Sequence, residues 1–194
     1  MTAWVLGKEI SSENLNETRT VKVTSYLRRA NRAELNYTLS FERSTLRVSV
    51  KLDKGSRQLE YLLECDWMEA GERGEGIPAL IFVLEPGYAV QSYRYQAGSG
   101  SIVRSELPHD VPSIGSMELL PEGADSYLQV FNNCKYGFRG WKNRGELRLL
   151  NSGFDPDPFP ELGRHYIDLM VGVCADKEEG ERQRTAHAHP LIAF

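Results

Sequence analysis

The chain is poor in cysteine and contains no long apolar run. Its 194 residues include three cysteines, and Cys65, Cys134 and Cys174 are too widely spaced for a zinc knuckle or a disulfide framework. This usage indicates a reducing compartment, and we expect a cytoplasmic protein. No stretch of about 18 apolar residues is present, so the sequence predicts no membrane span. The N-terminus lacks the basic segment and apolar core of a signal peptide.

Basic residues are not in excess either. The chain has 23 Lys and Arg against 27 Asp and Glu, which gives a formal net charge of −4. A general nucleic-acid binder needs a basic surplus to neutralise phosphates, so the balance argues against that class. The Gly-rich loop at residues 71–76 lacks the Lys-Ser/Thr ending of a phosphate-binding loop.

The chain is rich in short segments that alternate between apolar and polar residues. Leu35, Tyr37, Leu39 and Phe41 alternate in this way, and residues 46–52 repeat the pattern after the connection at 42–45. A period of two places each apolar set on one face of a strand, and the short connection predicts an antiparallel hairpin. Further strands are predicted at residues 20–27, 59–67, 77–84, 90–96, 117–120 and 165–173.

No segment of ten residues keeps the 3.6-residue period of an amphipathic helix. Residues 176–184 are charge-rich and are predicted to form a surface loop or a short helical turn. Many short strands separated by Gly, Pro, Asn and Asp turns are typical of an all-β fold. We therefore expect one domain over residues 1–194, a large antiparallel two-sheet sandwich.

Residues 127–157 form the most distinctive stretch. Tyr127–Phe131 and Glu146–Leu150 read as two strands joined by a turn-rich connection, and we predict that they pair as a hairpin. Short motifs follow one another here, namely Phe131-Asn132-Asn133-Cys134-Lys135-Tyr136-Gly137-Phe138, Leu149-Leu150-Asn151-Ser152-Gly153, Asp155-Pro156-Asp157-Pro158 and Gly163-Arg164-His165.

In this order the motifs resemble the C-terminal β-domain of glycoside hydrolase family 38, the α-mannosidases. The likeness is strongest over residues 120–170 and is collinear from about 35 to 119. It implies a supersandwich of the galactose-mutarotase-like kind. It also implies that the chain is a C-terminal fragment of a larger glycosidase.

The resemblance implies a division of labour with a catalytic domain. In this family the nucleophile and the ligands of a zinc ion lie in an N-terminal domain that nothing here resembles, and a retaining glycosidase needs two carboxyl groups about 5–5.5 Å apart. We expect an accessory domain that is inactive alone and holds no metal or cofactor. Its expected partners are the catalytic domain and a mannose-containing glycan. A homodimer through an exposed interdomain face is a further expectation.

Seven residues are candidates for substrate binding or for the domain interface. The Arg of the family's Leu-Leu-Arg motif is replaced here by Asn151, whose amide cannot form a bidentate guanidinium contact. Other roles stay open. Asn132 and Asn133 could cap a turn, and Lys135 and Tyr136 could form an exposed or interface pair. Arg164 could pair with Asp155 or Asp157. The candidates are Asn132, Asn133, Lys135, Tyr136, Trp141, Asn151 and Arg164.

Two further classes of function are considered. A free-standing carbohydrate-binding module would need an exposed aromatic platform, with Trp141 as the best candidate beside Trp4, Trp67, Tyr93, Tyr95 and Tyr136. A mutarotase-like enzyme would use His109 or His165 as general base.

Two pairs of polar residues have structural alternatives to a functional role. Glu64 and Asp66 share a strand face and are read as a solvent-facing edge rather than a catalytic pair. His187 and His189 share a face but lack the third ligand that a metal needs.

Overall fold

The computed structural model describes residues 9–98, 100–124, 126–132, 134–157 and 159–188. Almost all regular structure in this part of the chain is β-strand. The elements in order are α1 (Leu15–Thr18), β1 (Lys22–Arg28), β2 (Arg32–Phe41), β3 (Ser44–Asp53), β4 (Gln58–Trp67), β5 (Ala79–Leu84), β6 (Val90–Ala97), β7 (Gly100–Arg104), β8 (Val111–Pro112), β9 (Ser116–Pro121), β10 (Tyr127–Asn132), β11 (Gly137–Trp141), β12 (Arg144–Asn151), β13 (Gly163–Cys174) and α2 (Lys177–Ala188).

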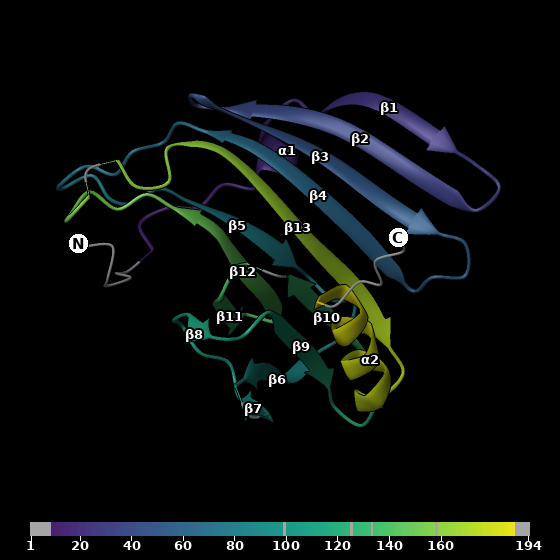
Figure 1. The fold of residues 1–194 in the computed structure, drawn as a ribbon. Coiled ribbons are helices and arrows are strands. Elements are labelled where there is room, and N and C mark those ends of the chain that lie inside the picture. Colours follow the sequence, from purple (N-terminus) through teal and green to yellow (C-terminus); the bar gives the residue numbers. More distant parts are fainter. Residues whose placement is uncertain (1–8, 99, 125, 133, 158, 189–194) are drawn as a thin grey trace. The chain divides into compact units, whose positions relative to one another are not determined.

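The strands form two antiparallel sheets (Figure 1). Nine strands follow the order β1-β2-β3-β4-β13-β10-β9-β6-β7, and four follow the order β5-β12-β11-β8. The predicted all-β, two-sheet antiparallel sandwich is confirmed. Within the described residues no helix is long and apolar enough to cross a membrane.

The chain divides into two compact units. The first consists of the described residues of Met1–Lys54, Glu60–Leu80 and Leu149–Ile167. The second consists of those of Gly55–Leu59, Ile81–Arg148 and Asp168–Phe194.

In the first unit the predicted hairpin of alternating residues is confirmed as β2 and β3. Leu39 pairs with Leu46, and the ladder continues to Phe41 and Ser44. Only two residues remain in the turn, fewer than the four predicted, and Glu42 takes a positive φ of 45° there. β1 continues the sheet beside β2. The unit's buried apolar side chains are those of Leu39, Phe41, Leu46, Val48, Leu63, Cys65, Trp67, Leu80, Leu149, Leu150 and Ile167.

In the second unit the two sheets pack face to face through glycine. A Cβ added to Gly140 of β11 would lie 2.3 Å from the ring of Tyr93 on β6. A Cβ added to Gly145 of β12 would lie 2.5 Å from Met117 on β9. Both distances are shorter than atomic contact, so the large side chains of one sheet occupy the space that the glycines of the other leave free.

The predicted hairpin between Tyr127–Phe131 and Glu146–Leu150 is wrong. β10 pairs with β9 and β13, whereas β12 pairs with β11 in the other sheet. The sequence pattern favours a turn at Gly140, yet Gly140 lies in β11, where the facing ring of Tyr93 leaves no room for a side chain. The actual hairpin turns at Lys142 and Asn143, whose φ values of 51° and 61° suit a two-residue turn.

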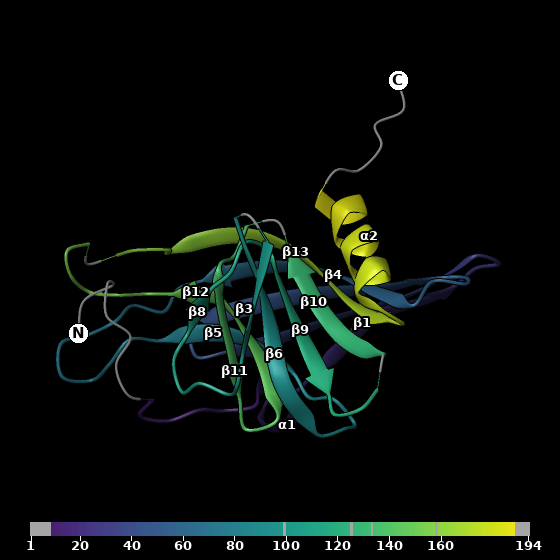
Figure 2. The same ribbon diagram turned by 90° about the horizontal axis from the view of Figure 1, so that it is seen from below.

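Helix α2 is longer than the predicted loop or helical turn. Asp176 accepts a hydrogen bond from the backbone N–H of Glu179 and caps the first turn. The helix lies against β10 (Figure 2), and a Cβ at Gly180 would be 2.5 Å from the hydroxyl oxygen of Tyr127. It has no apolar stripe, so the sequence carried no helical period to detect.

Candidate functional site

Asn132 shapes the turn that follows β10 in the second unit. Its side chain is buried, and its Oδ1 accepts from the backbone N–H groups of Cys134 (3.0 Å) and Lys135 (2.5 Å). This is the turn-capping role that its residue type suggested. Among the described residues, none forms a hydrogen bond with the Nδ2 of Asn132. Asn133 lies outside the described residues.

The other candidates of the second unit are more accessible. Tyr136 is 58% exposed, and Lys135 and Trp141 are half-buried. Trp141 is the last residue of β11 and pairs with Arg144 across the hairpin, rather than lying in a polar turn. Tyr136 and Trp141 are therefore the aromatic candidates that offer a ring surface to a ligand.

In the first unit, Ser152 anchors the loop after β12. Its hydroxyl accepts from the indole N–H of Trp67 at 2.5 Å and donates to the backbone carbonyl of Pro160 at 3.2 Å. The backbone N–H of Asn151 donates to the carboxylate of Glu161. A Cβ at Gly71 would lie 2.5 Å from the carbonyl oxygen of Ser152, so a second loop presses on the same point. The candidate Asn151 thus lies at the start of a fixed loop.

Arg164 belongs to an ion-pair network across three strands. Its Nε lies 2.7 Å from Asp66 and its Nη1 lies 3.6 Å from Glu64, while Arg47 contacts the same two carboxylates at 2.8 and 3.2 Å. Hydrogen bonds from Arg47 and then Arg164 hold the pKa of Asp66 below its ordinary value. Glu64 and Asp66 therefore act as ion-pair partners of Arg47 and Arg164.

The predicted pairing of Arg164 with Asp155 or Asp157 is wrong. β13 runs beside β4, which brings Arg164 to a carboxylate 98 residues away in the chain. Asp157 instead accepts from the backbone N–H of Phe159 in its own loop. Strand adjacency decided the partner, and a sequence alone does not show that adjacency.

An apolar strip lies on one sheet face of the first unit. Directly paired residues share a face, and the ladder sets Tyr26 opposite Leu35 and Leu35 opposite Val50. Exposure rises along this face from 2% at Leu39 to 63% at Tyr26. Sequence reasoning missed the strip because alternation looks the same whether a face is covered or open. We define the apolar strip as Val23, Tyr26, Leu35, Tyr37, Val50 and Leu52.

The aromatic platform loses half of its six members. Trp67, Tyr93 and Tyr95 are at most 2% exposed, so they are core residues and cannot stack on a sugar. Trp4 lies outside the described residues. The module hypothesis keeps Tyr136 and Trp141.

His165 and His187 each have contacts within their own unit. The Nε2 of His165 lies 2.6 Å from the backbone carbonyl oxygen of Glu161, which fixes the ring. His187 packs edge-on against Phe131, with ring centroids 5.1 Å apart, and lies 3.6 Å from Asp168. His189 lies outside the described residues, and within the described part no three His, Cys, Asp or Glu side chains group as metal ligands.

Two solved structures share this fold. One is a protein in glycosyl hydrolase family 38 from Enterococcus faecalis, with 11% identity and a TM-score of 0.71. The other is an alpha-mannosidase from Enterococcus faecalis V583, with 10% identity and a TM-score of 0.71. Each alignment covers 90% of this chain but 25% of the solved one. No protein-family model and no curated protein matches the sequence.

The predicted resemblance to family 38 is therefore confirmed as a likeness of fold. The chain spans a quarter of the length of these structures. Its class is an antiparallel β-sandwich of the kind found within α-mannosidase chains.

Proposed function

We propose that this chain is the accessory β-sandwich domain of a family 38 α-mannosidase. The observation that carries the proposal is the fold match over 90% of the chain to a quarter of a solved alpha-mannosidase. In this proposal a separate domain holds the two catalytic carboxyl groups and the zinc ion. This chain supplies support and has no mannosidase activity alone.

The apolar strip is the proposed contact with the catalytic domain. Tyr26 is 63% exposed and Val23 is 59% exposed, on a face whose other residues form the core of the first unit. Burying one large apolar side chain completely contributes about 1.5–3 kcal/mol, so several together sustain a stable contact. An open apolar face of this kind typically marks an interaction site.

The turn after β10 is the proposed contribution to the rim of the active site. Tyr136 offers an exposed ring there, and Lys135 a cation on the same turn. Asn132 acts indirectly in this proposal, because its Oδ1 holds the turn in shape. Asn151, the last residue of β12, has a similar supporting position at the start of the loop that Ser152 anchors.

The first experiment measures the native and denatured mass of the protein that carries this sequence in its source lysate, with an antibody raised to the chain. The proposal expects a native mass several times 22.0 kDa. The same species should hydrolyse a mannoside and lose activity with a zinc chelator. A native mass near 22.0 kDa would overturn the proposal, and twice that mass would point to the homodimer.

A pair of variants tests the strip in the parent protein. Tyr26→Lys places a cation in the proposed contact and should weaken domain association at least about tenfold, since an unpaired buried charge is costly. Leu27→Lys is the matched control, because Leu27 is also exposed and points to the opposite face of β1. Limited proteolysis should nick the Tyr26→Lys parent sooner; equal protection in both variants would reject the strip.

The alternative function is a free-standing carbohydrate-binding module. It is favoured by the exposed ring of Tyr136 and by the half-buried Trp141. A glycan-binding screen of the chain separates it from the accessory-domain proposal. Two results together would establish the carbohydrate-binding module. One is saturable glycan binding that Tyr136→Ala or Trp141→Ala removes, and the other is a native mass near 22.0 kDa.

A further inference from the structure

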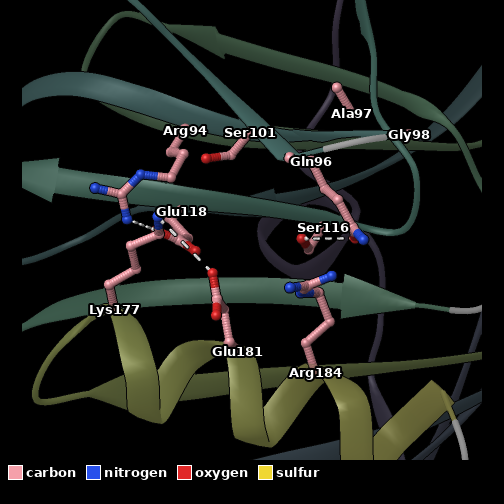
Figure 3. A pocket seen from close by; sticks show the side chains of 11 residues that line it. Arg94, Gln96, Ala97, Gly98, Ser101, Ser116, Glu118, Lys177, Glu181 and Arg184 are labelled. Atoms are coloured by element: carbon pink, nitrogen blue, oxygen red, sulfur yellow. Dashed lines mark hydrogen bonds and ion pairs between the residues drawn. The ribbon is translucent and has the colours of Figure 1, made fainter.

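The second unit contains a polar pocket between helix α2 and the strands β6 and β9 (Figure 3). Its volume is about 190 Å³, which corresponds to roughly six water-sized positions at about 30 Å³ each. Three residues of α2 form one wall, and Arg94, Gln96, Ser116 and Glu118 form the opposite wall (Figure 3). A site of this size takes a small ligand rather than an oligosaccharide.

Two of the three cations in the pocket already have carboxylate partners. Arg94 contacts Glu118, which is 6% exposed, and the Nζ of Lys177 lies 3.8 Å from Glu181. Arg184 is half-buried and makes no hydrogen bond or close ion pair with any other residue that the structure describes, although its charge acts on Glu118 at longer range. The pocket thus holds three cations and two carboxylates, a surplus of one positive charge.

The unpaired guanidinium shares the pocket with neutral polar groups. Ser116 donates to the Oε1 of Gln96 at 3.4 Å, which leaves the amide nitrogen of Gln96 as a donor. Figure 3 shows Arg184 on the α2 wall, facing these two residues across the pocket. A guanidinium offers two parallel N–H groups that match the two oxygens of a carboxylate or phosphate group.

We propose that this pocket binds a small anion through a single carboxylate or phosphate group, with Arg184 as its main partner. One negative group would bring the pocket to neutrality, and the amide of Gln96 would donate to one of its oxygens. Glu118 does not oppose this, because Arg94 lies against its carboxylate. The proposal is independent of any mannosidase role.

The test is isothermal calorimetry at constant ionic strength. The full chain is titrated with inorganic phosphate and, separately, with gluconate. Saturable binding of at least one of the two anions is expected. Binding of phosphate alone assigns a phosphate ligand, and binding of gluconate alone assigns a carboxylate ligand. Neutral mannose is the third arm, and mannose binding as tight as the anion would overturn the proposal.

Arg184→Gln should weaken anion binding about tenfold or more, as loss of a charge-assisted pair does. Arg182→Gln is the matched control on the same helix, because Arg182 pairs with Glu178 and does not line the pocket. Arg184→Lys keeps the charge and should recover part of the affinity, which separates a binding defect from a folding defect. Absence of saturable binding, or equal loss in Arg182→Gln and Arg184→Gln, would refute the site.

Discussion

Gly140→Ala should destabilise the second unit by an amount that the structure allows to be worked out. The new Cβ would lie 2.3 Å from the ring of Tyr93, whereas carbon atoms pack at about 3.5–4.0 Å. One partner must therefore move by more than about 1 Å. Tyr93 is 2% exposed and has no free space to enter.

Movement of the glycine strand is costly too. The backbone N–H of Gly140 donates to the hydroxyl of Tyr95 at 3.0 Å, and withdrawal of β11 would break that bond. Overpacking costs about 1–3 kcal/mol, and the lost hydrogen bond adds about 1 kcal/mol. The reduced entropy of the unfolded chain returns about 0.4–1 kcal/mol. The net loss is about 1–3.5 kcal/mol, with a middle value near 2.3 kcal/mol.

The assay is equilibrium unfolding in urea, read by fluorescence and circular dichroism. With a slope of about 2–3 kcal/mol per molar, the midpoint should fall by about 1 M. Gly100→Ala is the control: a Cβ there meets nothing within 4 Å, so this variant should keep only the small entropic gain and its midpoint should not fall. If the two variants unfold within about 0.5 kcal/mol of each other, the face-to-face packing through glycine is wrong.

Two further predictions concern titratable groups. Burial raises the pKa of Cys65 and Cys174 to about 12. At pH 8 an Ellman assay should therefore count one fast thiol, Cys134, in the native chain and three in denaturant. Cys134→Ser should abolish the fast phase, and a fast phase that persists would contradict the assignment. Arg164→Gln should lower the free energy of unfolding at pH 6. The difference from the wild type should shrink below pH 4, because Asp66 has a lowered folded pKa and its stabilisation is lost as pH falls through that value. A difference that does not change with pH would refute the network.

Alternation predicted the strands well because it reports one physical quantity, which side of a strand is buried. β2, β3, β4 and β13 each have apolar residues at every second position, and each appears close to its predicted range. Which strands pair with each other is a separate property, and alternation carries no information about it. Gly140 resembles a turn residue until the facing ring of Tyr93 is known, so β11 was missed and its hairpin was assigned to the wrong strands.

The candidate residues show the same limit. The capping role of Asn132 follows from local geometry, and the sequence contained it as an alternative. The partner of Arg164 and the unpaired state of Arg184 depend on strands and helices that are distant in sequence. The apolar strip is exposed because no other described element of the first unit covers that part of the sheet face, and the alternation within a strand does not show whether a face is covered.

The outer strand β1 determines how the first unit can associate. Its register with β2 shifts between Val23 and Ser25, and the strand begins and ends with the basic residues Lys22 and Arg28. An irregular, charged border discourages the addition of another strand, which is how sheet proteins avoid growing into fibres. The first unit can therefore expose apolar side chains to a partner without polymerising by strand addition. A partner binds on the face of the sheet, whereas the edge strand β1 does not pair with a further strand.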